Sequence, residues 1–177
     1  MKVNLSIIPE CYADTNLVET ITNSYQGFNH QKNCNKVGST MQIKFADAFA
    51  LGIIDKDKKS IVYLKEFEQV AIFEDLFLFK HPNKHHYIIQ IFPAIERFIL
   101  KSAEEVGVDL SLFGLPSDFE ELKRITKRQT SKLNPALRNL FNELKNKNAS
   151  QIVTLSNWIS YLKENTYNSE IEEIIEL

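Results

Sequence analysis

Two short apolar runs, each stopping abruptly at acidic residues, most constrain how this chain can fold. The first, VNLSIIPE at 3–10, ends at Glu10, and the second, ALGIIDKDKK at 50–59, loses its apolar character at Asp55. Apolar, β-branched runs of this length are typical of buried strands. We therefore expect two strands in the interior of a sheet, each with a carboxylate at its end.

Helical patterns alternate with strand patterns up to about residue 107. The expected elements in chain order are a strand at 3–10, a helix capped by Asp14 or Thr15, a helix at 41–49, strands at 50–59, 75–81 and 85–91, and a helix at 93–107. Residues 60–70 fit either a helix or a turn. The alternation favours an α/β fold with a mainly parallel sheet flanked by helices.

The last third of the chain has helical periodicity throughout. Helices are expected at 117–128, where Ser117 and Glu120 form a capping-box pattern, at 134–146 and at 151–165. We therefore divide the chain into an α/β domain at 1–108 and a helical C-terminal extension at 109–177 packed on it. The amphipathic end of this extension suits packing within the chain, or against a protein partner or a second copy.

The net charge of −2 is a sum of opposing blocks. Residues 123–147 carry eight basic side chains and one acidic side chain, whereas the segments on either side are acidic. Lys123, Arg124, Lys127 and Arg128 recur at helical spacing and predict a ridge that binds phosphates without reading sequence. The alternative is a solvated helical face paired with the acidic tail.

Several classes are excluded by missing motifs. The five glycines are scattered, so neither a phosphate-binding P-loop nor a dinucleotide fingerprint is present. No apolar run approaches the roughly 20 residues of a membrane span, and the N-terminal segment lacks a signal-peptide pattern, so we expect a cytoplasmic protein. Two cysteines, Cys11 and Cys34, are expected to be reduced thiols rather than part of a disulfide framework or a zinc site.

The strand ends carry the candidate chemistry. Glu10 ends the first strand, and Asp55 and Asp57 end the second. Since ligands of open α/β sheets bind at the carboxyl edge of the strands, these carboxylates are expected to meet there. Such oxygen ligands suit Mg²⁺ or Mn²⁺, which can activate water and neutralise charge in phosphoryl transfer. The alternative is that all three are solvated loop residues or helix caps.

The stretches IIPECYADTNLVETI and ALGIIDKDK resemble the first strand and helix, and the Asp-x-Asp strand, of Toprim domains. The resemblance covers about residues 3–107 and implies a Toprim-like, Rossmann-like fold. It implies that Glu10 acts as the general acid/base and also contributes to the metal site, and that Asp55 and Asp57 bind Mg²⁺. PAIERFIL resembles a helix start that follows the metal strand in related families, so Glu96, together with Asp14, is a further acidic candidate.

Toprim domains cut or join nucleic-acid phosphodiesters, so the resemblance implies a Mg²⁺-dependent, nuclease-like protein acting on DNA or RNA. A stand-alone protein of this kind also suits a role in defence against foreign DNA. The loop FNHQKNCNKVGS supplies Lys32 and Lys36 for a phosphate, and His30 to orient water or a leaving group. The same loop also fits an exposed polar connection.

The alternative function is a non-catalytic interaction module that keeps the Toprim-like scaffold. It is motivated by Cys11, which stands where Toprim domains usually place a glycine. Glycine permits close approach of the backbone to a ligand, and cysteine does not share that property. The charge-segregated helical tail points to the same alternative.

Overall fold

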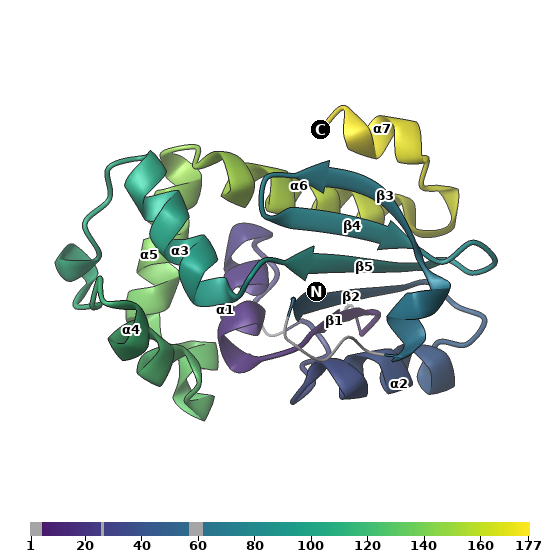
Figure 1. Ribbon diagram of the computed structural model, residues 1–177, viewed down its shortest axis with the longest axis horizontal. Helices are drawn as coiled ribbons and strands as arrows, with labels where there is room; N and C mark the ends of the chain where they lie inside the picture. Colours follow the sequence, from purple (N-terminus) through teal and green to yellow (C-terminus); the bar gives the residue numbers. More distant parts are fainter. Residues whose placement is uncertain (1–4, 26, 57–61) are drawn as a thin grey trace.

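The computed structural model describes residues 5–25, 27–56 and 62–177. Its centre is a mixed sheet with the strand order β1-β2-β5-β4-β3 (Figure 1). The strands are β1 (Ile7–Pro9), β2 (Ala50–Asp55), β3 (Glu68–Phe73), β4 (Leu76–Lys80) and β5 (His86–Ile91). β1, β2 and β5 run parallel, whereas β4 and β3 continue the sheet antiparallel. The prediction of an α/β sheet flanked by helices is confirmed, and the parallel pairing is confined to β1, β2 and β5.

The central strands are buried along their length, as their unbroken apolar sequences predict. β5 is buried at every residue, and β2 is buried up to Asp55. β3 and β4 are more exposed because they lie towards one edge: only Ala71 of β3 is buried, and β4 is buried at Leu76 and Leu78. Within β2, a Cβ on Gly52 would lie 2.9 Å from Val37 Cγ1 and 3.1 Å from Met41 Sδ. Glycine at this position therefore lets the neighbouring helix approach the sheet closely.

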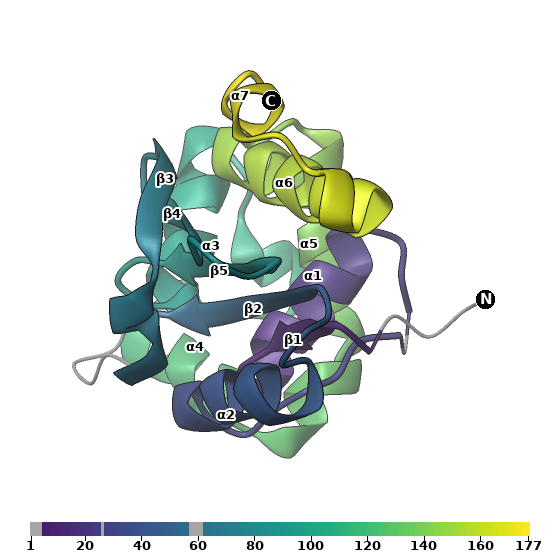
Figure 2. The same cartoon turned by 90° about the vertical axis from the view of Figure 1, so that its right-hand side faces the viewer.

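Helices cover both faces of the sheet (Figure 2). α1 (Tyr12–Ile21), α5 (Pro135–Asn146) and α6 (Ser150–Asn165) lie on one side, and α2 (Cys34–Lys44) with the short helix η1 (Val62–Glu66) lies on the other. The remaining helices are α3 (Ile95–Glu105), η2 (Leu110–Phe113), α4 (Phe119–Thr126), η3 (Gln129–Leu133), η4 (Thr166–Asn168) and α7 (Ile171–Ile175). Each face of the sheet thus has its own apolar cluster.

Several helix starts differ from those predicted. α3 begins at Ile95, two residues later than expected, with Ala94 at its N-cap. α1 is capped by Cys11 instead of Asp14 or Thr15: the Cys11 Sγ accepts from the backbone of Asp14, whose carboxylate accepts from the backbone of Cys11. α4 is capped by Asp118, one residue later than expected, because its carboxylate accepts the Glu121 N–H.

The second helix begins at Cys34 instead of residue 41. Asn33 caps it by accepting the Lys36 N–H at 3.0 Å. Most of its residues are polar, and its buried apolar residues are Cys34, Val37 and Met41 on one side. This narrow stripe hides the helical period in the sequence, so part of the expected loop is helical.

The C-terminal helices share the larger apolar cluster with the sheet. The cluster includes residues from Ile7 in β1 to Ile174 in α7. Asn16 of α1 donates to the carbonyls of Ser131 and Asn134, which joins α1 to the start of α5. The division into two domains at residue 108 stays a prediction. The larger apolar cluster contains residues from both sides of this boundary.

The acidic tail lies against α6. The Trp158 indole N–H donates to the Ile174 carbonyl, and the Tyr161 hydroxyl donates to the Glu173 carboxylate. α7 and α4 lie at opposite ends of the molecule in both views (Figures 1 and 2). The tail is therefore not the partner of the basic residues on α4. Within the described part of the chain, no helix combines the length and the apolar character that a membrane crossing requires.

Candidate functional site

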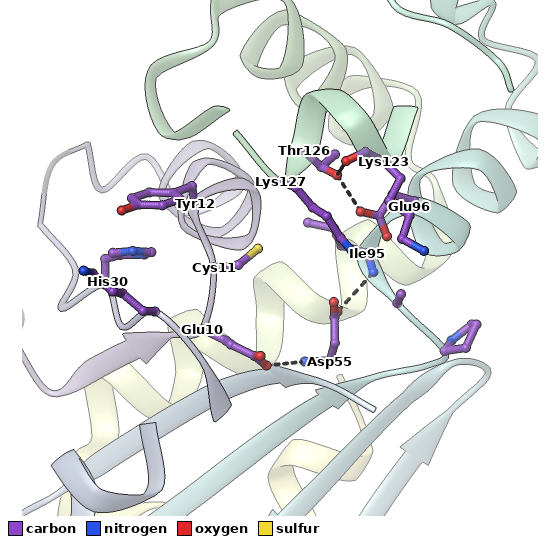
Figure 3. Close-up of a pocket in the computed structure, with 13 residues that line it drawn as sticks. Glu10, Cys11, Tyr12, His30, Asp55, Ile95, Glu96, Lys123, Thr126 and Lys127 are labelled. Atoms are coloured by element: carbon purple, nitrogen blue, oxygen red, sulfur yellow. Dashed lines mark hydrogen bonds between the residues drawn. The ribbon is translucent and has the colours of Figure 1, made fainter. Parts of the chain in front are cut away.

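A cavity of about 470 Å³ opens at the carboxyl edge of the parallel strands (Figure 3). It is bounded by the ends of β1 and β2, the starts of α1 and α3, and α4. The lining residues are Glu10, Cys11, Tyr12, His30, Lys32, Asp55, Pro93, Ala94, Ile95, Glu96, Lys123, Thr126 and Lys127. The structure therefore brings three of the predicted carboxylates and three of the predicted lysines to one cavity.

Glu10 and Asp55 lie side by side because their strands are parallel neighbours. The Glu10 N–H donates to the Ile53 carbonyl at 2.9 Å, which extends the pairing of β1 and β2 by one residue. The Asp55 N–H in turn donates to Glu10 Oε2 at 3.1 Å. Asp55 Oδ1 accepts the N–H of Ile95, the first residue of α3, at 3.0 Å. Both carboxylates are thus held by backbone N–H groups of different elements.

Two further carboxylates lie close to this pair and are almost fully buried. Asp14 is 1% exposed in the first turn of α1, and its Oδ1 has no hydrogen-bond partner among the described residues. Glu96 is 5% exposed in the first turn of α3 and accepts the hydroxyl of Thr126 in α4. Negative charge at helix starts is stabilised by the helix dipole, which partly offsets the cost of burial.

Burial and neighbouring negative charges raise the pKa of two of these carboxyl groups, Asp14 and Asp55. Burial, helped by the charge of Glu96, raises the pKa of Asp14 from 3.8 to about 6. Burial raises the pKa of Asp55 well above its usual range, and the charges of Asp14, Glu10 and Glu96 add to the effect. This cluster therefore favours a bound proton or a cation, because each reduces the repulsion between the negative charges.

The Cys11 thiol at the same place is not an activated nucleophile. Burial and the neighbouring charge of Asp14 raise its pKa well above the ordinary thiol value. The thiol form therefore dominates at neutral pH, and nucleophilic chemistry needs the thiolate. Its observed role is structural, as the cap of α1.

Lysines supply the positive charge in the cavity. Lys32 enters from the loop before α2, and Lys123 and Lys127 enter from α4 and its end. The other predicted phosphate-binding residues, Lys36, Arg124 and Arg128, do not line this cavity. Asp57 lies outside the described residues, so its role as a metal ligand stays a prediction.

The donor chemistry of the cavity fits a magnesium-type ion. No group of three described His, Cys, Asp or Glu side chains is arranged to hold a metal by itself. Mg²⁺ commonly uses one or two carboxylates and completes its shell with water and phosphate oxygens, so Glu10 and Asp55 are sufficient in number. The buried, unpartnered Asp14 Oδ1 and the raised pKa of Asp55 are features that a cation nearby would relieve.

Tyr12 and Thr126 also line the cavity, although the sequence patterns did not predict them as site residues. The ring of Tyr12 stacks on that of His30 at a centroid distance of 4.2 Å, and Thr126 holds Glu96. Both contacts join residues that are far apart in sequence, so no local pattern indicates them. Only the position of Tyr12, directly after the Glu10–Cys11 pair, was a usable signal.

The histidines around the β4–β5 turn are not all exposed. His81 and His86 are buried beside Tyr63, whose hydroxyl lies 2.6 Å from His86 Nδ1. His86 Nε2 donates to the Phe45 carbonyl, so Nδ1 accepts the hydrogen of the tyrosine. His86 is paired with Ala50 at the amino end of β2, whereas the carboxylate cavity lies at the carboxyl end, and neither histidine lines that cavity.

Comparisons with protein-family models, with curated proteins and with solved structures found no match for this chain. The fold and the cavity therefore define the class: an α/β protein with an acidic, lysine-lined cavity at the carboxyl edge of parallel strands.

Proposed function

We propose that this protein is a Toprim-like phosphodiesterase that hydrolyses DNA or RNA with Mg²⁺ or Mn²⁺. The observation that carries the proposal is the pairing of Glu10 with Asp55 at the ends of adjacent parallel strands, with three lysines lining the same cavity. Carboxylates beside lysines suit a phosphate held near a divalent ion, since the ion and the lysines together offset the negative charges.

The proposed roles follow from the position of each side chain. Glu10 and Asp55 hold the ion, which when bound would supply an activated water and neutralise charge on the phosphate. Glu10, at the open end of β1, takes the proton of the attacking water. Lys32, Lys123 and Lys127 contact the phosphate backbone as point charges.

Asp14 and Glu96 act on this chemistry through charge. Both contribute to the raised pKa of Asp55, and Asp14 itself titrates at about pH 6. A divalent ion requires the ionised carboxylates, so metal binding releases protons and strengthens as the pH rises through this range. Cleavage is therefore expected to increase from about pH 5 to about pH 7.

The test is cleavage of single-stranded and double-stranded DNA and RNA with Mg²⁺, Mn²⁺ or a chelator. Glu10→Gln and Asp55→Asn retain an oxygen that can accept the observed backbone hydrogen bonds, so they remove charge with little change of shape. We expect each to lower the rate by about 10²-fold or more. Glu104→Gln and Asp47→Asn change exposed carboxylates outside the cavity and serve as matched controls. Cleavage that survives both cavity substitutions would refute the proposal.

The second candidate is a non-catalytic interaction module on the same scaffold. It is favoured by Cys11, whose side chain caps α1 at the position where a catalytic Toprim domain usually has glycine. This candidate predicts that no divalent ion binds. A calorimetric titration that shows micromolar to millimolar binding of Mg²⁺ or Mn²⁺, lost in Asp55→Asn, would exclude it.

A further inference from the structure

A second cavity, of about 680 Å³, adjoins the carboxylate cavity and shares Tyr12 with it. Its other walls come from η3 and the start of α5 and include Gln129, Lys132, Leu133, Asn134 and Pro135. Tyr12 thus lies between the carboxylate cavity, whose lysines suit a phosphate, and the second cavity.

The Tyr12 ring is held firmly in this position. It stacks on the His30 ring with an angle of 22° between the planes. The Thr15 hydroxyl donates to the Cys11 carbonyl at 2.7 Å, so it accepts the Nδ1–H of His30 at 3.0 Å. Figure 3 shows the stacked rings on one side of the cavity and Glu96, Lys123 and Lys127 on the other. A ring fixed in advance loses little entropy when a ligand packs against it.

The second cavity differs from the first in its chemistry. Tyr12, Leu133 and Pro135 offer apolar surface, and Leu133 is 58% exposed. The Gln129 amide can donate and accept hydrogen bonds, and the Asn134 amide can donate, since its Oδ1 already accepts backbone N–H groups at the start of α5. Lys132 is its charged lining residue, and among the described residues no carboxylate lines it. These properties suit a flat group with an apolar face and a polar edge, joined to an anion.

A nucleobase attached to a phosphate has this combination of properties. We propose that the second cavity binds an unpaired nucleobase next to the phosphate held in the carboxylate cavity, with Tyr12 as its stacking surface. The inference rests on the proposed function and specifies its substrate as single-stranded nucleic acid. A base in a duplex is paired and stacked, and would have to leave the helix to enter such a pocket.

The first experiment uses the full chain with Asp55→Asn, which is expected to slow cleavage by about 10²-fold or more, and measures fluorescence anisotropy. The probes are a labelled single strand of DNA, a strand of equal length built from abasic units, and the corresponding duplex. Stacking of one base typically strengthens binding by about 5- to 150-fold. We therefore expect the normal strand to bind at least about 5-fold more tightly than the abasic strand and the duplex.

Variants of the stacking ring complete the test. Tyr12→Leu should bring binding of the normal strand down to that of the abasic strand and leave the abasic strand unchanged. Tyr12→Phe keeps the ring and should retain binding. Tyr167→Leu changes a half-exposed tyrosine whose hydroxyl contacts Phe49, next to the amino end of β2, and should have no effect.

The results separate this inference from the proposed function. Equal binding of the normal and abasic strands, or of strand and duplex, would overturn the base pocket while leaving metal-dependent cleavage intact. Cleavage that is unchanged in Glu10→Gln and Asp55→Asn would instead refute the proposed function. Failure of every probe to bind would overturn the base pocket, while the cleavage assay decides the proposed function separately.

Discussion

Replacing Asp14 by Asn should make the stability of this protein less dependent on pH. The Asp14 side chain is 1% exposed and has a pKa of about 6, against 3.8 for an ordinary aspartate. An asparagine oxygen can still accept the Cys11 N–H, so the cap of α1 is kept while the charge is lost. The substitution therefore isolates the cost of ionising a buried carboxyl group.

The size of the effect follows from linkage. A shift of about two pKa units corresponds to about 3 kcal/mol, of which roughly 2 kcal/mol develops between pH 4 and pH 7. Because the native pKa lies above the unfolded one, the native state binds more protons in this range. The contribution of Asp14 therefore favours folding near pH 4 and is lost as the pH rises past 6.

The assay is urea unfolding of both proteins near pH 4 and near pH 7 in the presence of a chelator. We expect the stability difference between Asp14→Asn and the unchanged protein to move by about 2 kcal/mol in favour of the variant at the higher pH. Asp118→Asn, at the exposed cap of α4, is the matched control and should show no such change. A difference that stays constant with pH, or that moves the other way, would refute the reasoning.

Three further results are expected. Mg²⁺ should raise the melting temperature more at pH 7 than at pH 5, because protons compete for the carboxylates, and Asp55→Asn should remove the gain in a thermal-shift assay; an equal gain at both pH values would count against a carboxylate site. Thr126→Val leaves the buried Glu96 without its hydroxyl donor and should cost about 1–3 kcal/mol in urea unfolding at pH 7; an unchanged midpoint would show that this bond contributes nothing. Gly52→Ala should cost about 1–3 kcal/mol because its Cβ would lie 2.9 Å from Val37, and combining it with Val37→Ala should cost less than the two changes added; strict additivity would contradict the steric cause.

The strand ends were predictable because their signal is local. A buried parallel strand is apolar on both faces, so Glu10 and Asp55 are conspicuous where the apolar runs stop. The helical third was predictable for the same reason, since α5 and α6 repeat apolar residues at helical spacing over three turns or more. The start of α2 was not predictable, because its buried apolar residues are only Cys34, Val37 and Met41 and most of its other residues are polar.

The sequence by itself determined an α/β chain with acidic strand ends, a basic segment and a helical C-terminal third. Each of these depends on residues that are neighbours along the chain. Only the tertiary structure decided that Thr126 holds Glu96, that Tyr12 stacks on His30, and that Lys123 and Lys127 face the same cavity as Lys32. These contacts depend on how α4 and the loop before α2 pack around the end of β2, and packing of distant segments leaves no periodic trace in a single sequence. The charged residues of the cavity could therefore be predicted from the sequence, whereas the shape of the cavity depends on the tertiary structure.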